Sequence, residues 1–226
     1  MSATTVVFDV GGTLIHPDFS ALQEWTRQRM AGEVSTAAVE RAFRLAIAGD
    51  VFTASGMEIE TQAARYFSLC GGQRVHRRRW TGWWREIIAA GGVDSWLYKI
   101  VDPEAAATLA HLRELGCRLV AASNSNGTLA AELRSFGLLE HFCEVHDSTL
   151  IGAAKPSLTF FEHVLRSCCS GSVFHVGDDL IKDVVAAAPA SFRCAILYDP
   201  SGIYGGIPPH VRIRRLSELP AVIGAV

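Results

Sequence analysis

Short apolar segments that end at polar side chains constrain the fold of this chain more than any other feature. They show little alternation between apolar and polar residues, which is typical of strands buried on both faces of a parallel sheet. Helical patterns separate the later segments, as in repeated strand–helix–strand units. The sequence therefore predicts a doubly wound α/β sheet. Its strands are expected in TTVVFDV at the start, CRLVAAS from 117, SVFHVGD from 172 and RCAILYD from 193, with a shorter strand near 142–145.

Residues 18–95 follow a different pattern. They show helical periodicity over several segments and no convincing strand. We expect an all-helical domain over 18–95, inserted into an α/β core formed by residues 1–17 and 96–226. Aromatic side chains dominate small cores, so the tryptophans of this stretch are expected inside its helical bundle. They are Trp25, Trp80, Trp83 and Trp84.

Composition limits the classes of partner and compartment. The 226 residues include 21 basic and 23 acidic side chains and carry a net charge of -2, which implies no overall attraction to nucleic acid or to an anionic membrane. No segment is long and apolar enough to span a bilayer, and the start lacks a secretory pattern. The six cysteines lack the paired spacing of zinc sites or disulfide scaffolds, so we expect a cytoplasmic protein with buried, reduced thiols. Nothing in the sequence indicates the oligomeric state.

Polar side chains gather where the predicted strands end. In an open parallel sheet, ligands bind beyond the carboxyl ends of the strands, so these side chains are expected to share one site. A lysine also opens the helix that precedes the third long strand. The residues are Asp9, Ser123, Asn124, Lys155, Asp178 and Asp179, followed by Asp183 in the next helix.

This combination favours phosphoryl chemistry. Asp9 can attack phosphorus, but the neighbouring aspartates would repel a phosphate dianion unless their charge were compensated. A Mg²⁺ ion bound by carboxylate oxygens, together with the ammonium of Lys155, would supply that compensation. Ser123 and Asn124 can donate hydrogen bonds to phosphoryl oxygens, and Asp183 can orient a metal-bound water.

Four segments in this order resemble the motifs of the haloacid dehalogenase-like (HAD) hydrolase superfamily over essentially the whole chain. They are VVFDVGGTL, AASN, AAKP and HVGDDLIKD. The helical insertion resembles the cap domain that the family places between its first and second motifs. The resemblance implies a Rossmann-like core and a phosphatase-type member of the family.

The resemblance also implies individual roles. Asp9 would be the nucleophile that forms an aspartyl-phosphate, and Mg²⁺ would be held by Asp9, Asp178 and the backbone carbonyl of Gly11. Asp179 and Asp183 would support the metal from outside its ligand sphere. The phosphoryl group would be positioned by Thr13, Ser123, Asn124 and Lys155.

Gly11 departs from the family pattern. Phosphatases of this family generally carry a second aspartate at this position, which acts as general acid and base. Such a group contributes about 10² to 10⁴ in rate, so its loss should matter most for poor leaving groups. The protein would then use good leaving groups, recruit another acid, or lack turnover. His16 is the nearest alternative acid, although its neighbours Pro17 and Asp18 favour a plain hinge or surface histidine.

We therefore expect a Mg²⁺-dependent phosphatase of a small phosphorylated metabolite. The alternative is a protein that binds a phosphoryl ligand, or regulates through it, with impaired turnover. A 2-haloacid dehalogenase is disfavoured because the fourth motif keeps carboxylates that such metal-free enzymes lack. Cleavage of a carbon–phosphorus bond is disfavoured because the helical insertion contains no lysine for a Schiff base, and Lys99 lies only at its exit.

Overall fold

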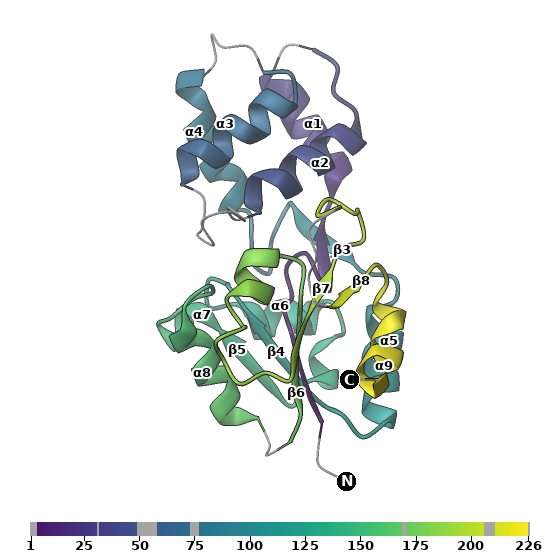
Figure 1. Cartoon of the computed structure of the whole chain (residues 1–226). Coiled ribbons are helices and arrows are strands. Elements are labelled where there is room, and N and C mark those ends of the chain that lie inside the picture. Colours follow the sequence, from purple (N-terminus) through teal and green to yellow (C-terminus); the bar gives the residue numbers. More distant parts are fainter. Residues whose placement is uncertain are drawn as a thin grey trace.

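The computed structural model describes residues 4–30, 32–48, 58–72, 77–168, 171–205 and 211–225. A six-stranded sheet forms the lower body in Figure 1, and a group of helices lies above it. The strand order is β5-β4-β1-β6-β7-β8, and every neighbouring pair is parallel. The doubly wound α/β sheet is thus confirmed. Its strands are β1 (Thr5–Phe8), β4 (Arg118–Ser123), β5 (Glu144–Asp147), β6 (Val173–Gly177), β7 (Cys194–Tyr198) and β8 (Val211–Ile213).

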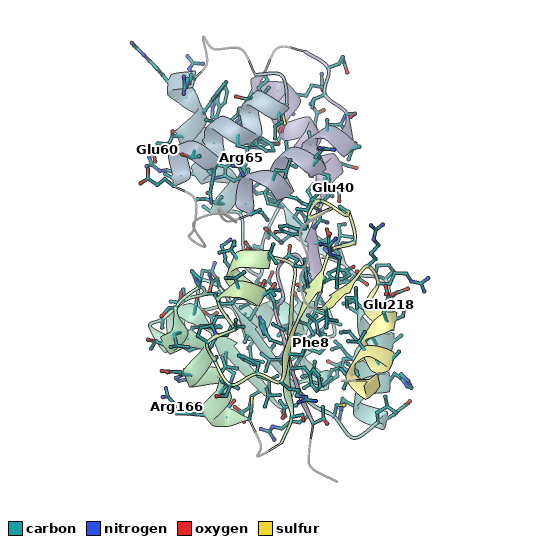
Figure 2. All side chains as sticks on the ribbon, in the orientation of Figure 1. Phe8, Glu40, Glu60, Arg65, Arg166 and Glu218 are labelled. Atoms are coloured by element: carbon teal, nitrogen blue, oxygen red, sulfur yellow. The ribbon has the colours of Figure 1, made fainter. Side chains whose placement is uncertain are left out.

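Side chains of β1 alternate between the two faces of the sheet, because successive residues of a strand point in opposite directions. Val6 and Phe8 pack with α5, α6 and α9, and Val7 packs with α8 on the other face. Phe8 lies inside the sheet body in Figure 2, whereas Arg166 and Glu218 lie exposed on flanking helices. These helices are α5 (Ala105–Glu114), α6 (Leu129–Ser135), α8 (Leu158–Ser167) and α9 (Leu219–Ala225), with η4 (Leu216–Glu218) just before α9.

The upper helices have an apolar core of their own, as expected for this stretch. Trp80 and Trp84 are buried in it, and Trp25 and Trp83 pack against it. The Thr26 and Tyr66 hydroxyls, 2.6 Å apart, satisfy each other inside this core. The helices are α1 (Phe19–Arg29), α2 (Thr36–Ile47), α3 (Ile59–Leu69) and α4 (Arg77–Ile88).

A two-stranded antiparallel ribbon joins the helical group to the sheet body. It is formed by β2 (Ile15–Pro17) and β3 (Tyr98–Val101), so the chain leaves and returns side by side. The ribbon was not anticipated from the sequence, because three or four residues with polar members carry no strand pattern by themselves. It brings Tyr98 to the same edge of the sheet as Asp9.

The shorter elements are η2 (Leu139–His141), α7 (Ser148–Ile151) and the π-helical turn η3 (Leu180–Val185). Asp183 lies in the first turn of η3, in the helix that follows β6, as the sequence analysis expected. Among the residues described, no helix has the length and apolarity to cross a membrane.

The expectation of buried thiols is wrong for most of the described cysteines. All five are free, but Cys70 alone among them is buried, and Cys143 is exposed. Burial raises the pKa of the Cys70 thiol to about 12, because the thiolate would lose its hydration. Cys169 lies outside the described residues.

Candidate active site

A cavity of about 430 Å³ lies beyond the carboxyl ends of β1, β4 and β6. Its lower wall comes from the sheet body and its upper wall from the ends of α2 and α4 and the following segment, 88–92. This is the edge at which an open parallel sheet binds its ligands. All the expected site residues except Thr13 line it. They are Asp9, Gly11, Ser123, Asn124, Lys155, Asp178, Asp179 and Asp183.

Three side chains donate hydrogen bonds to the Asp9 carboxylate. Its Oδ1 accepts hydrogen bonds from the Ser123 hydroxyl at 2.9 Å and the Lys155 ammonium at 2.6 Å. Its Oδ2 accepts one from the Thr13 hydroxyl at 3.2 Å. Burial raises the pKa of Asp9 above its ordinary value, with Asp183 adding to the shift and Lys155 opposing it. The side chain is thus fixed in orientation and needs positive charge to stay ionised.

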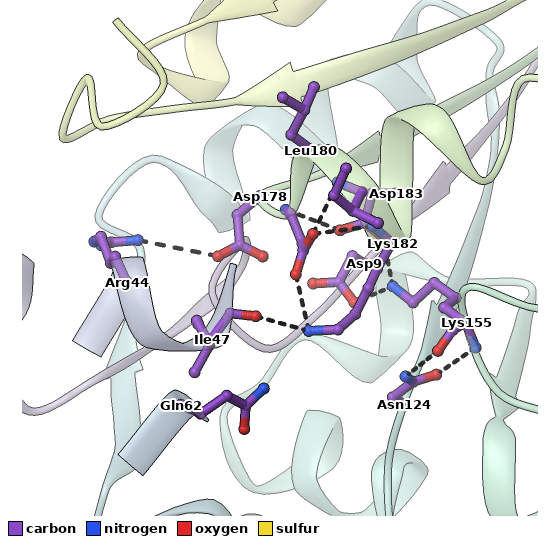
Figure 3. Close-up of polar contacts among 12 residues, drawn as sticks. Asp9, Arg44, Ile47, Gln62, Asn124, Lys155, Asp178, Leu180, Lys182 and Asp183 are labelled. Carbon is purple, nitrogen blue, oxygen red and sulfur yellow. Dashed lines mark hydrogen bonds and ion pairs between the residues drawn. The ribbon is translucent and has the colours of Figure 1, made fainter. Parts of the chain in front are cut away.

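Lys155 bridges two carboxylates. Its Nζ lies 2.6 Å from Asp9 Oδ1 and 2.6 Å from Asp183 Oδ1. Burial by itself would lower the pKa of Lys155, but Asp183 and Asp9 outweigh it and raise that pKa. Figure 3 shows Lys155 reaching Asp9 from one side, while its backbone is held by Asn124.

Asp183 is held from three directions. Its Oδ1 contacts Lys155 and also His175 Nε2 at 3.1 Å, and its Oδ2 accepts the backbone N–H of Asp179 at 3.1 Å. Burial would raise the pKa of Asp183, but Lys155 and His175 hold it below its usual range. Gly177 permits this packing, because a Cβ at that position would collide with the Asp183 side chain. Asp183 therefore remains a buried anion.

Less positive charge lies near the Asp178 carboxylate than near Asp9 or Asp183. Among the described residues its nearest cation is Arg44 on α2, with 4.0 Å between Arg44 Nη1 and Asp178 Oδ2 (Figure 3). Burial, Asp9 and Asp183 raise its pKa well above the ordinary value. Gly12 makes room for this carboxylate, since it has a φ of +97° and a Cβ there would overlap Asp178. A residual negative charge thus collects between Asp9 and Asp178.

A divalent cation fits this donor set. Oxygen atoms of Asp9, Asp178 and Asp183 lie within 4.8 Å of one another. Carboxylate oxygens are the ligands that Mg²⁺ prefers. Burial, and then repulsion from neighbouring carboxylates, raises the pKa values of Asp9 and Asp178, and a bound cation would stabilise their charged forms.

Two of the expected site residues are engaged in supporting contacts. The Asn124 side chain exchanges two hydrogen bonds with the backbone of Lys155, at 2.9 and 2.8 Å, so it orients the lysine. The Asp179 carboxylate accepts the backbone N–H groups of Ile181 and Lys182, which caps η3, and pairs with the Lys182 ammonium at 2.8 Å.

Gly11 lies exposed at the cavity wall. A Cβ built on it would stand 3.6 Å from the Tyr98 ring, an ordinary van der Waals contact. The left-handed glycine of this loop is Gly12, so the backbone does not require glycine at position 11. A side chain at this position is therefore sterically acceptable.

Contacts from the helical group reach the site, and sequence reasoning missed them. Arg44 approaches Asp178, and Lys182 donates to the backbone carbonyl of Ile47, the last residue of α2, at 3.2 Å. Arg44 is buried among the apolar residues of α2, a position that the sequence alone does not reveal. His175 did carry a signal, because a histidine inside a buried strand needs a polar partner.

His16 does not line the cavity. Its Nε2 lies 3.0 Å from Asp102 Oδ2, which also accepts a hydrogen bond from the Tyr198 hydroxyl at 2.6 Å. His16 thus lies on β2, within the ribbon, as part of a mostly buried polar cluster.

Comparisons with known proteins identify the family and the fold of the chain. A family model described as haloacid dehalogenase-like hydrolase matches residues 3–191. The haloacid dehalogenase-like hydrolase domain-containing protein 3 of Danio rerio is 28% identical, with 96% of this chain and 94% of that protein covered.

Solved structures that share the fold include the following two. YfnB from Bacillus subtilis, solved with magnesium, is 18% identical with a TM-score of 0.65 and 99% of each chain covered. A HAD phosphatase from Thermococcus onnurineus is 21% identical with a TM-score of 0.58, and 99% of this chain and 98% of that one are covered. The chain belongs to the haloacid dehalogenase-like hydrolase family.

Proposed function

We propose that this hydrolase is a Mg²⁺-dependent phosphatase of a small phosphorylated molecule, with Asp9 as its nucleophile. The observation that carries the proposal is the setting of the Asp9 carboxylate. The Asp9 side chain is buried at the wall of the cavity, and one of its oxygens accepts hydrogen bonds from both the Ser123 hydroxyl and the Lys155 ammonium. This arrangement supports attack on a dianionic phosphoryl group, because the nucleophile and the compensating charge are already in place.

The reaction has two steps. An oxygen of Asp9 attacks phosphorus, so an oxygen–phosphorus bond forms on Asp9 and the bond to the leaving oxygen breaks. Water then attacks the phosphorus of the aspartyl-phosphate, which releases phosphate and restores the carboxylate. Lys155 offsets the negative charge on the phosphoryl oxygens in both steps, while Thr13, Ser123 and the amide of Asn124 hold the reacting groups in position.

We assign the metal to Asp9, Asp178 and the backbone carbonyl of Gly11. Asp183 belongs outside the ligand sphere, because Lys155 and other donors already engage its oxygens, and Asp179 supports the same region by capping η3. When bound, Mg²⁺ would neutralise carboxylate charge and polarise the phosphoryl group.

The helical group is proposed as a cap domain. Residues 18–95 would form the cap, and residues 1–17 and 96–226 the core. The upper cavity wall from α2 and α4 supports this division, since it would exclude water and select the substrate. A cytoplasmic location is part of the same proposal.

A second candidate is a protein that binds a phosphoryl ligand, or regulates through it, with little turnover. Gly11 favours it, because no carboxylate stands at the position where the family generally has its acid and base. The side chains around Asp9 still support the positioning of a phosphoryl group and the neutralisation of its charge. We therefore consider phosphatase activity the better-supported function. A 2-haloacid dehalogenase remains disfavoured, since a metal-free reaction would leave the Asp178 carboxylate, which is mostly buried near Asp9 and Asp183, without a role.

The test compares the wild type with Gly11→Asp on an aryl and an alkyl phosphate, with Mg²⁺. An aryl leaving group departs without protonation, so the wild type should hydrolyse it, and Gly11→Asp should gain about 10² to 10⁴ on the alkyl ester alone. The aspartate side chain should fit at position 11, because its Cβ would make only an ordinary van der Waals contact with the Tyr98 ring. Asp9→Asn is the blank. Activity that appears only in Gly11→Asp would place the ligand-binding function first.

A further inference from the structure

Glu132 is a carboxylate in the cavity that the proposed chemistry does not use. It lies on α6, lines the cavity and is only 7% exposed. Among the described residues, no hydrogen bond or ion pair ends on its carboxylate. Burial and the nearby Asp147 raise the pKa of Glu132, so its charged form is costly while the cavity is empty. A buried carboxylate without a hydrogen-bond donor is unfavourable, so a ligand that donates a hydrogen bond to it would be stabilised in the cavity.

The groups around Glu132 do not supply that partner. Asp147, on β5, is an anion whose oxygens already accept backbone N–H groups of Gly127, Leu129 and Thr149. Tyr98, on β3, also lines the cavity, and no hydrogen bond joins it to Glu132 among the described residues. Glu132 and the nucleophile thus line the same cavity, Glu132 from α6 and Asp9 from the end of β1.

The charges of the described cavity lining are unbalanced. Its two ammonium groups are already committed, because Lys155 pairs with Asp9 and Asp183, and Lys182 pairs with Asp179. No arginine or histidine belongs to this lining. Apart from the phosphoryl pocket, the lining thus offers no free cation for a second anionic group of the substrate. The acidic side chains of the lining are Asp9, Glu132, Asp178, Asp179 and Asp183.

We propose that Glu132 is a specificity residue that selects phosphate esters whose leaving group carries a hydrogen-bond donor, a hydroxyl or an ammonium group, and rejects those with a carboxylate or a second phosphate. The proposal rests on the proposed function for the position of the phosphoryl group, which occupies the Asp9 and Lys155 end of the cavity. The rest of the substrate then extends toward α6. Its donor would bond to Glu132, whereas an anion would meet an unpaired negative charge.

The experiment measures binding, so that turnover is not needed. Alkyl phosphates of graded chain length, each ending in an amino, a hydroxyl or a carboxylate group, are titrated calorimetrically into Asp9→Asn protein with Mg²⁺. The same titrations are made in Asp9→Asn combined with Glu132→Gln, with Glu132→Asp, and with Glu162→Gln, an exposed glutamate of α8 that controls for net charge. Hydrolysis of an aryl phosphate by the wild type is measured in parallel.

At the best chain length, we expect the amino or hydroxyl ester to bind about 10-fold to 100-fold more tightly than the carboxylate ester. Glu132→Gln should abolish most of this preference, while Glu132→Asp and Glu162→Gln should keep its direction. The amino and hydroxyl arms show which donor is preferred. Equal binding of all three esters, or a preference unchanged in Glu132→Gln, would overturn the proposal.

The failures of the two proposals are distinguishable. Aryl phosphate hydrolysis without a preference that depends on Glu132 would overturn the role of Glu132 alone. A preference that depends on Glu132, without hydrolysis, would support the role of Glu132 and overturn the phosphatase function. If Glu132→Gln slowed wild-type turnover of alkyl esters whatever their end group, Glu132 would be a proton donor and the specificity role would be wrong.

Discussion

The Lys155 ammonium lies 2.6 Å from the Asp9 carboxylate, although 146 positions separate the two residues in the chain. Both side chains are buried, so Lys155 helps Asp9 to stay charged, while Asp183 and Asp9 together stabilise the charge of Lys155 inside the protein. The pair couples the stability of the fold to the proposed chemistry.

Lys155→Met should therefore lose both stability and activity. It leaves Asp9 and Asp183 buried without their cation, which we expect to lower the free energy of unfolding by about 3–5 kcal/mol. Turnover of an aryl phosphate should fall by about 10² or more. Denaturant unfolding and steady-state kinetics measure the two effects. Lys182→Met is the matched control, because the Lys182–Asp179 pair is more exposed, and an equal loss of stability in both variants would contradict this account.

Asp178→Asn should stabilise the metal-free protein. The Asp178 carboxylate is mostly buried near Asp9 and Asp183, and its removal relieves their repulsion, with an expected gain of roughly 0.5–2 kcal/mol. The same change removes a proposed metal ligand, so the rise in Tm on adding Mg²⁺ should disappear. Thermal unfolding with and without Mg²⁺ tests both points.

The neighbouring Asp179→Asn serves as the control for that experiment. Asp179 caps η3 and pairs with Lys182, so its variant should be less stable than the wild type and should still respond to Mg²⁺. A lower Tm of metal-free Asp178→Asn than of wild type would show that no such repulsion exists.

His16→Ala should keep the wild-type activity on an alkyl phosphate to within about twofold. The imidazole is bonded to Asp102 and does not line the cavity, so it is not placed to protonate a leaving group. The variant should unfold more easily, by about 1 kcal/mol, because Asp102 loses a hydrogen-bond partner. Activity lost on the alkyl ester but kept on an aryl ester would instead make His16 the missing acid.

Asp102 should make stability depend on pH in the acidic range. Burial would raise its pKa, but hydrogen bonds from His16, Tyr198 and the backbone of Glu104 bring it below the ordinary value. The folded pKa is thus lower than the unfolded value near 3.9, so the contribution to stability is complete above that value and is lost as the pH falls through the folded pKa.

Asp102→Asn should accordingly be less stable than the wild type at neutral pH, and the difference should shrink below about pH 4. Urea unfolding at neutral pH and at about pH 3 measures it. A difference that stays constant over this range would show that Asp102 titrates alike in the folded and unfolded chain.

The sheet could be predicted because its central strands carry their own signal. β1, β4, β6 and β7 are apolar runs that fit burial on both faces. β8 and the β2–β3 ribbon are three or four residues long, and their strand form depends on the partner that lies alongside. The π-helical form of η3 likewise had no local signature.

The residues of the candidate site also fall into those that the sequence indicates and those that depend on tertiary packing. Asp9, Ser123 and Asp178 follow directly from strand ends, since parallel strands bring their carboxyl ends to one edge. Arg44 and Glu132 could not be predicted, because their places depend on how α2 and α6 pack against the sheet. Sequence reasoning also assigned the Asn124 amide to the phosphoryl group, and the structure shows it bonded to the Lys155 backbone.

The most direct test of the central claim is the rate of Mg²⁺-dependent phosphate release from an aryl phosphate by the wild type and by Asp9→Asn. We predict turnover by the wild type that stops when Mg²⁺ is removed, and a rate for Asp9→Asn no higher than that of the uncatalysed reaction. Turnover by Asp9→Asn at the wild-type rate would show that Asp9 is not the nucleophile and would contradict the account.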